Sequence, residues 1–148
     1  MIIEKIVIKS FGAINDMTLE QIRELRIVNA EGEVTEQQIP TLEEVLETLD
    51  GNVELLLEIK RKNGNNQGIE EATLEIIRKY DALPYTTFQS FDDSVLEKLH
   101  SLDDSLKLEK LLFAKILGLP IIIDGTLSLF SKEKYSYIKS FNFYHHAL

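Results

Sequence analysis

Two charged side chains close an apolar stretch in the first half of the chain. Glu58 and Lys60 follow Leu55–Leu57, a run that is apolar on both faces. Residues two apart in a β-strand point to the same side, so this carboxylate and this amine would lie together. Catalytic groups collect at the carboxyl ends of strands in parallel α/β folds. From the residues alone, the simpler interpretation of Glu58 is a structural carboxylate that pairs with Lys60 or Arg61.

A capped amphipathic helix leads into this strand. Thr41 and Glu44 have the T-x-x-E spacing of a capping box, and Pro40 stands where a helix begins. Asp50-Gly51 supplies the turn between helix and strand. Because the strand is apolar on both faces, we expect a parallel sheet that helices cover. Four apolar residues recur at helical spacing and give the helix one buried face: Leu42, Val45, Leu46 and Leu49.

Strand and helix patterns alternate along the chain, and this order predicts an α/β fold with right-handed connections and parallel strands. A second capping box, Thr18 with Gln21, opens a short helix, and Arg26–Gln38 is expected to be a loop or hairpin. Leu106–Leu119 fits either a strand followed by a helix or one helix. The other expected strands are Ile2–Ile8, Tyr85–Ser90, Pro120–Asp124 and Tyr135–Phe143, and the other expected helices are Ile69–Tyr80 and Asp92–His100, the latter with Val95, Leu96 and Leu99 as its apolar face.

Three motifs, taken in order, resemble the glycerophosphodiester phosphodiesterase family. They are IPTLEEVL at Ile39–Leu46 with LEIK at Leu57–Lys60, then QSFD at Gln89–Asp92, and SFNFYH at Ser140–His145. The resemblance runs from about Asp16 to the C-terminus. It implies a (β/α)8 TIM barrel, and metal-dependent hydrolysis of glycerophosphodiesters to glycerol 3-phosphate and an alcohol.

The resemblance also implies roles for four residues. Glu58 corresponds to a ligand of a divalent cation, Mg²⁺ or Ca²⁺, which are hard ions that take carboxylate oxygens. Lys60 corresponds to a phosphate clamp, and Phe91 and Asn142 correspond to residues that line the substrate cleft. Three of them have simpler alternatives: an ion pair for Lys60, strand-end packing for Phe91, and a backbone hydrogen bond in a turn for Asn142.

Other parts of the family pattern are not found in this sequence. A full barrel needs roughly 250 residues, whereas the chain has 148. The family's early His-Arg, its acidic pair and its following His-Asp are missing, and there is no tryptophan. We therefore interpret residues 1–148 as a single incomplete domain, the middle portion of a barrel whose ends are lost or supplied elsewhere.

The histidines do not replace the missing acid and base. His100 ends an amphipathic helix, where a cation meets the helix dipole favourably. His145 and His146 do not match the family's catalytic positions, and adjacent side chains of an extended segment point to opposite faces. We therefore predict no catalytic residue, and we expect the chain alone to be inactive. The alternative is a non-catalytic remnant that acts as a binding or assembly module.

Composition narrows the range of partners. The net charge of −9 argues against nucleic acid, because phosphate backbones need clustered cations. No apolar run is long enough to span a membrane, and the sequence has neither cysteine nor a signal-peptide pattern, so a cytoplasmic protein is expected. Because an incomplete barrel leaves sheet edges and its interior face open, we expect a homo-oligomer or a complementing fragment.

Overall fold

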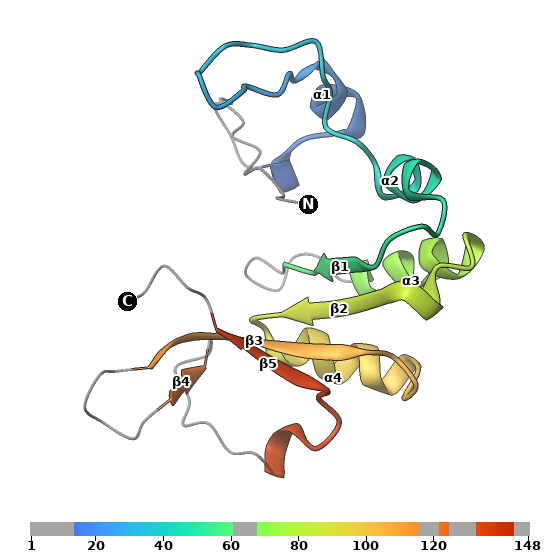
Figure 1. The fold of residues 1–148 in the computed structure, drawn as a ribbon, viewed down its shortest axis with the longest axis vertical. Helices are drawn as coiled ribbons and strands as arrows, with labels where there is room; N and C mark the ends of the chain where they lie inside the picture. The colour runs from blue at the N-terminus through green and yellow to red at the C-terminus, as the bar shows by residue number, and fades with distance from the viewer. Residues whose placement is uncertain (1–13, 61–67, 116–121, 125–132, 144–148) are drawn as a thin grey trace. The chain divides into compact units, whose positions relative to one another are not determined.

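The computed structural model describes residues 14–60, 68–115, 122–124 and 133–143 (Figure 1). The chain forms two compact units, residues 1–45 and residues 46–148. The expected strand over Ile2–Ile8 lies outside the described residues. In the described part, the first unit holds short helices and a hairpin, and the second unit holds the sheet.

The described part of the first unit starts with a short 3₁₀ turn, Ile14–Asp16, and helix α1, Leu19–Glu24. The predicted capping box of α1 is confirmed. The Gln21 N–H donates to Thr18 Oγ1 at 3.3 Å, and the Thr18 N–H donates to Gln21 Oε1 at 2.8 Å. These two bonds satisfy backbone donors that the first turn of a helix leaves open.

The segment after α1 forms a hairpin, which was one of the two structures that the sequence allowed. Val28 and Val34 form an antiparallel bridge. Between them, Gly32 adopts a φ of +86°, a conformation that glycine accepts without the clash of a Cβ atom. The Thr35 N–H donates to the carbonyl oxygen of Ile27 at 2.9 Å and extends the pairing beyond the bridge.

Helix α2 spans Leu42–Leu49 and has the predicted capping box. The Thr41 N–H donates to Glu44 Oε2 at 2.8 Å, and the Glu44 N–H donates to Thr41 Oγ1 at 3.2 Å. Glu44 also pairs with Arg23 of α1. The Asp50-Gly51 turn after the helix is confirmed, because both residues have positive φ values, 46° and 69°.

The second unit contains a sheet whose main strands are parallel (Figure 1). Its parallel strands are β1 (Leu55–Glu58), β2 (Thr86–Ser90), β3 (Leu108–Lys115) and β5 (Ser140–Phe143). β2 lies between β1 and β3, and β5 pairs with β3. The predicted α/β class, with parallel strands alternating with helices, is confirmed.

One strand departs from the parallel prediction. β4 (Ile122–Asp124) falls within the expected strand Pro120–Asp124, but it pairs antiparallel with β3. Only residues 116–121 separate these two strands. A parallel crossover needs a dozen or more residues, so a connection this short can only return the chain antiparallel.

Three other segments differ from their predicted bounds. Within Leu106–Leu119, residues 108–115 form strand β3, so the interpretation of this segment as one helix is wrong. Tyr85 belongs to a 3₁₀ turn, Leu83–Tyr85, which precedes β2. The expected last strand, Tyr135–Phe143, begins only at Ser140, because Glu133–Tyr135 forms another 3₁₀ turn.

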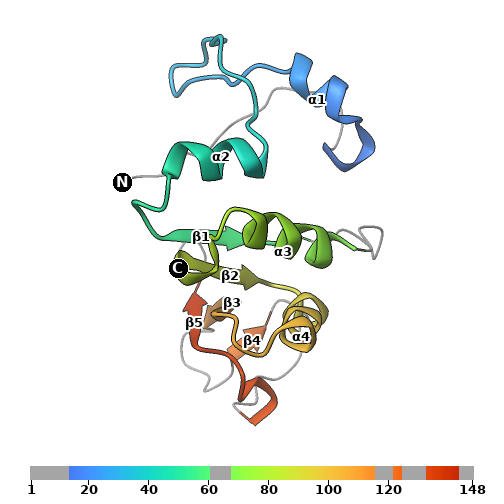
Figure 2. The ribbon, with the colours of Figure 1, turned by 90° about the vertical axis from the view of Figure 1, so that its right-hand side faces the viewer.

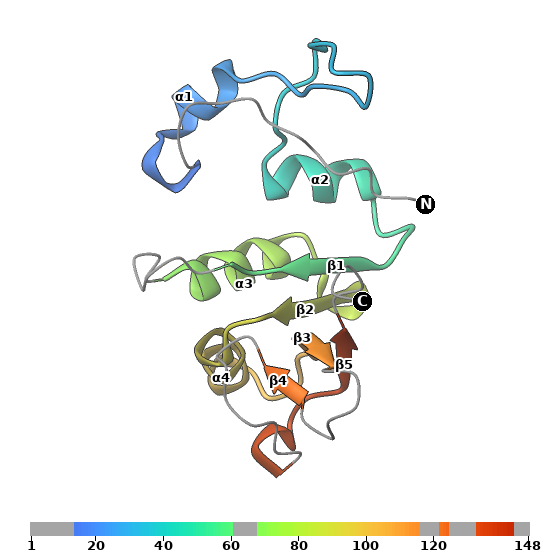
Figure 3. The same ribbon diagram turned by 90° about the vertical axis from the view of Figure 1, so that its left-hand side faces the viewer.

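Two helices connect the first three strands. α3 (Ile69–Lys79) joins β1 to β2, and α4 (Asp93–Leu102) joins β2 to β3. Because such crossovers are right-handed, two steps in one direction place both helices on the same face of the sheet, and α3 and α4 lie side by side there (Figures 2 and 3). As predicted, the apolar face of α4 is fully buried, and with the sheet it forms the core: Phe88, Val95, Leu96, Leu99, Leu108 and Leu112.

Candidate functional site

The register of the parallel strands aligns polar residues toward the carboxyl end of the sheet. Glu58 of β1 lies opposite Gln89 of β2, and Gln89 lies opposite Glu109 of β3. Residues in register on parallel strands point to the same face, about 4.8 Å from one strand to the next. Asn142 of β5 joins this row, because its Nδ2 donates to Glu109 Oε2.

These residues lie on the face of the sheet that α3 and α4 do not cover. Lys110, the residue after Glu109, contacts Asp93 of α4 and therefore points to the helix side. Successive residues of a strand point to opposite faces, so Glu109 points away from the helices. We call this uncovered face the inner face and name its polar residues the inner-face row: Glu58, Gln89, Glu109 and Asn142.

Glu58 and Lys60 lie together, as their spacing predicted. Lys60 Nζ is 3.6 Å from Glu58 Oε2, and the side chains of Lys60 and Glu58 are 78% and 25% exposed, respectively. Such an exposed ion pair adds little stability, typically about 0–1 kcal/mol. The other carboxylate oxygen, Glu58 Oε1, is buried and has no hydrogen-bond partner among the described residues.

This oxygen of Glu58 has the chemistry that a divalent cation requires. A buried carboxylate oxygen without a donor is costly, and a hard cation such as Mg²⁺ or Ca²⁺ would satisfy it. Within the described ranges, no group of three or more His, Cys, Asp or Glu side chains comes together around it. The described residues therefore fit one ligand of a metal site.

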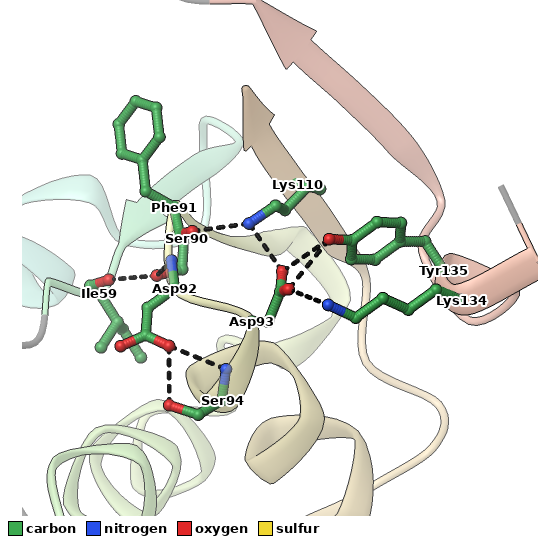
Figure 4. A network of polar contacts seen from close by, with 9 residues as sticks. All are labelled: Ile59, Ser90, Phe91, Asp92, Asp93, Ser94, Lys110, Lys134 and Tyr135. Atoms are coloured by element: carbon green, nitrogen blue, oxygen red, sulfur yellow. Dashed lines mark hydrogen bonds and ion pairs between the residues drawn. The ribbon is translucent and has the colours of Figure 1, made fainter. Parts of the chain in front are cut away.

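Phe91 lies in the turn that joins β2 to α4, directly after Ser90. The Ser90 hydroxyl donates to the carbonyl oxygen of Ile59 at 2.7 Å, and the Asp92 N–H donates to Ser90 Oγ at 3.1 Å. Lys110 Nζ donates to the carbonyl oxygen of Phe91 at 2.6 Å. These bonds hold the backbone of the turn, while the Phe91 ring points away from the polar network (Figure 4).

A polar cluster that the sequence did not predict lies beside this turn, on the helix side (Figure 4). Lys110 is fully buried, and its Nζ is 2.7 Å from Asp93 Oδ1. The Tyr135 hydroxyl lies 3.0 Å from each carboxylate oxygen of Asp93, and Lys134 pairs with the same carboxylate. We call these four residues the Asp93 cluster.

The Asp93 carboxylate stays charged despite its burial. Burial raises the pKa of this carboxyl group, but hydrogen bonds from Lys110, Lys134 and Tyr135 outweigh burial and hold the pKa below its usual value.

A charged side chain inside an apolar strand almost always has a partner of opposite charge. Glu109 and Lys110, two charges between Leu108 and Leu111, were the sequence signal that could have revealed both the cluster and the inner-face row.

The described histidine has a structural environment. His100 lies in α4, and its ring stacks on Tyr137 with the ring centroids 4.6 Å apart. The predicted structural position of His100 near the end of a helix is confirmed. His145 and His146 lie outside the described residues.

A small hollow of about 240 Å³ lies at the other end of the strands. Its lining comes from the segments that precede β2 and β3, so it opens at the amino ends of these strands, away from Glu58. It is therefore separate from the inner-face row. The residues that line it are Leu83, Pro84, Ser105, Leu106 and Lys107.

Comparison with known proteins gives consistent matches. The family model of the glycerophosphoryl diester phosphodiesterase family matches residues 6–116. A crystal structure of a glycerophosphoryl diester phosphodiesterase from Parabacteroides distasonis shares 25% identity, with a TM-score of 0.54 over 74% of this chain and 36% of that one. No curated protein shows significant similarity in sequence.

Two further solved structures share the fold at lower identity. A protein from Galdieria sulphuraria, assigned as a glycerophosphodiester phosphodiesterase, has a TM-score of 0.66 and 22% identity over 93% of this chain and 51% of that one. A protein from Silicibacter pomeroyi, assigned as a glycerophosphoryl diester phosphodiesterase, has a TM-score of 0.58 and 23% identity over 70% of this chain and 43% of that one.

The chain thus spans about a third to a half of the length of the solved structures that it matches. Those structures are TIM barrels, and the sheet and helices of the second unit are part of such a barrel. The inner face of the sheet corresponds to the barrel interior. Among the described helices, none has the length and apolar character needed to cross a membrane.

Proposed function

Because the chain belongs to the glycerophosphoryl diester phosphodiesterase family, we propose that its inner-face row is part of a site that hydrolyses glycerophosphodiesters to glycerol 3-phosphate and an alcohol. One observation carries this proposal. Glu58 and Lys60 lie together at the carboxyl end of β1, where barrel enzymes place their chemistry, and Glu58 Oε1 is buried without a hydrogen-bond partner among the described residues.

Glu58 and Lys60 divide the binding of a phosphodiester between them. Glu58 ligates a divalent cation, Mg²⁺ or Ca²⁺, which when bound polarises the phosphoryl oxygens as a Lewis acid. Lys60 contributes a positive charge to the phosphate. Its amine is mostly exposed and its partner Glu58 is 3.6 Å away, so the side chain can turn toward a ligand at little cost.

The other inner-face residues contact the rest of the substrate. Asn142 donates to Glu109, and this fixes the orientation of the carboxylate on the inner face. A carboxylate held in this way accepts hydrogen bonds from the hydroxyl groups of a glycerol moiety. Phe91, whose ring points away from the polar network (Figure 4), contributes an apolar contact beside the bound substrate.

The chain alone binds but does not turn over its substrate. Hydrolysis needs a general acid and a general base, and His100 is stacked on Tyr137 within the helix layer. The acid and base are supplied from outside residues 1–148. The family match covers residues 6–116 and so crosses both compact units, which supports treating them as parts of one domain.

Calorimetric titration with glycerol 3-phosphate, with and without Mg²⁺ or Ca²⁺, tests this function. We expect cation-dependent binding that Glu58→Gln abolishes and that Lys60→Met weakens about tenfold, the effect of one lost charge-assisted contact. The matched controls are Glu75→Gln on α3 and Lys139→Met before β5, both at exposed positions, which should bind like the wild type. Binding that is independent of the cation, or unchanged in Glu58→Gln, would show that the inner-face row is not such a site.

A further inference from the structure

Lys110 is a fully buried lysine on the helix side of β3, and the function proposed above does not use it. Burying an ammonium group costs several kcal/mol unless it is paired and hydrogen-bonded. Apolar residues at such a position are often as stable as a buried ion pair. The presence of a lysine here therefore calls for a reason beyond stability.

The contacts of Lys110 show what it adds. Asp93 does not depend on Lys110 for a partner, because Lys134 and the Tyr135 hydroxyl also bind its carboxylate. What Lys110 contributes beyond the ion pair is the 2.6 Å hydrogen bond from its Nζ to the carbonyl oxygen of Phe91. Its ammonium group also lies 5.8 Å from the centre of the Tyr135 ring.

The carbonyl of Phe91 lies between two other attachments of the same turn. On one side, Ser90 Oγ bonds to the carbonyl oxygen of Ile59, 2.7 Å away, at the end of β1. On the other side, Asp92 Oδ1 caps α4 by accepting from the Ser94 N–H at 2.8 Å. Lys110 reaches this turn from β3, whereas the turn itself joins β2 to α4. The backbone of Phe91 is therefore held by a third element of the unit (Figure 4).

We propose that Lys110 is a positioning residue that holds the Phe91 backbone from the helix side, so that the Phe91 ring is presented to the ligand bound on the inner face. This role rests on the proposed function, because it requires Phe91 to contact the substrate. Two consecutive residues of β3 thus act on opposite faces of the sheet. Glu109 contacts the ligand on the inner face, and Lys110 holds the backbone of the turn from the helix side.

A tryptophan reporter tests the positioning itself. The sequence contains no tryptophan, so Phe91→Trp introduces a single tryptophan at the turn, which is excited selectively at wavelengths that tyrosine does not absorb. In the Phe91→Trp background, we expect Lys110→Met to lower the fluorescence anisotropy, shift the emission to the red and increase quenching by acrylamide. Lys134→Met is the matched control, because it also removes a cation from Asp93 but leaves the bond to the backbone of the turn in place. It should leave the spectrum unchanged.

Two results would overturn the positioning role. One is an unchanged tryptophan signal in Lys110→Met, and the other is an equal change in Lys134→Met, which would indicate general loosening of the Asp93 cluster. If Lys110→Met does not fold, the double change Asp93→Asn with Lys110→Met carries the test. The introduced amide can still accept from the Tyr135 hydroxyl, and no uncompensated buried charge remains.

The link to the ligand is tested in the chain with Phe91 retained. Titration with glycerophosphocholine and Mg²⁺ should show about tenfold weaker binding in Lys110→Met and wild-type binding in Lys134→Met. Wild-type affinity in Lys110→Met would overturn the role in ligand presentation even if the tryptophan reporter responds. If the wild-type chain binds no glycerophosphocholine, the proposed function fails and the presentation of Phe91 fails with it, while the fluorescence measurement still decides whether Lys110 fixes the turn.

Discussion

The hydroxyl group of Ser90 donates a 2.7 Å hydrogen bond to the carbonyl oxygen of Ile59. Both residues are buried, and the Ile59 N–H in turn donates to the carbonyl oxygen of Gln89 at 3.0 Å. The end of β1 is therefore held to the end of β2 by a side chain as well as by the backbone. Because Glu58 and Lys60 flank Ile59, this bond fixes the backbone that carries both candidate binding residues.

Ser90→Ala should destabilise the chain by about 1–3 kcal/mol, because it removes a partner from the buried Ile59 carbonyl and from the Asp92 N–H. Urea unfolding followed by circular dichroism measures this change. Ser101→Ala is the control: its hydroxyl also bonds to a backbone carbonyl, that of Lys98 at 2.7 Å, but it is exposed. The control should lie within about 0.5 kcal/mol of the wild type. A similar value for Ser90→Ala would contradict the role of this bond.

Asp93 should make the stability of the chain depend on pH in the acid range. Burial alone would raise the pKa of Asp93 in the folded chain, but hydrogen bonds from Lys110, Lys134 and Tyr135 outweigh burial and lower it. The contribution of Asp93 to stability is therefore complete above its unfolded pKa of about 4 and is lost as the pH falls through the lowered value. Asp93→Asn should cost about 3–5 kcal/mol at neutral pH and flatten the acid limb of the stability curve.

Unfolding in urea at a series of pH values measures this dependence. Asp104→Asn, at an exposed position of the turn after α4, is the matched control and should keep the wild-type curve. If Asp93→Asn retains the full acid dependence, the Asp93 cluster does not supply it.

Tyr137 should make the stability of the chain fall as the pH rises in the alkaline range, the opposite direction to the effect of Asp93. Burial, followed by the charges of Glu97 and Asp93, raises the pKa of Tyr137 to about 12. Its contribution to stability is present below its unfolded pKa of about 10 and is lost as the pH rises through the folded value. Tyr137→Phe should remove this alkaline loss.

At neutral pH, Tyr137→Phe should be neutral or stabilising by up to about 1 kcal/mol, because the buried hydroxyl has no hydrogen-bond partner among the described residues. Tyr135→Phe is the contrasting change, since it removes a hydroxyl that binds both oxygens of Asp93, and it should destabilise the chain. Equal effects of the two changes in urea unfolding would argue against this distinction.

The purified chain should show essentially no turnover of glycerophosphocholine with Mg²⁺ or Ca²⁺. Loss of general acid-base catalysis alone lowers rates by about 10²–10⁴-fold, and the described residues bring no group of three or more His, Cys, Asp or Glu side chains together around a metal position. A phosphate-release assay coupled to a phosphatase measures the product. Turnover at an ordinary enzymatic rate that disappears in Glu58→Gln would show that the chain carries a complete site.

The open inner face should drive assembly into a homo-oligomer or with a complementing fragment. Leu56 lies two residues before Glu58 on β1, so it faces the same side, and it is 49% exposed. Among the described strands, β1 has a partner on one edge only. Light scattering should give a mass above the 17.0 kDa of one chain, and Leu56→Lys should shift it toward that value. A monomeric wild-type chain that unfolds cooperatively would exclude self-assembly.

Local sequence patterns predicted the structure correctly where the interactions that determine it join residues close together in the chain. The capping boxes of Thr18 with Gln21 and of Thr41 with Glu44 join residues three apart, so their spacing alone predicts the hydrogen bonds that the structure shows. The apolar face of α4 followed in the same way from the helical period. The predicted roles of Glu58, Lys60, Phe91 and Asn142 remain predictions, which the titrations above test.

Where the sequence pattern was compatible with two structures, the neighbouring strands of the folded sheet decided which one forms. Residues 108–115 could have been helical, but pairing with β2, β4 and β5 makes them a strand. The direction of β4 followed from the short connection to β3 rather than from its own apolar residues.

Sequence patterns alone were enough to predict the α/β class, the family and the proximity of Glu58 and Lys60, because these depend on local patterns and on residues close together in the chain. Only the tertiary structure decided that Glu109 meets Asn142 and that Asp93 meets Lys110, Lys134 and Tyr135. These contacts join residues separated by 17 to 42 positions, and the pairing of β3 with β5 and the packing of α4 on the sheet bring them together. Register depends on the packing of the whole sheet, which no short window of sequence contains.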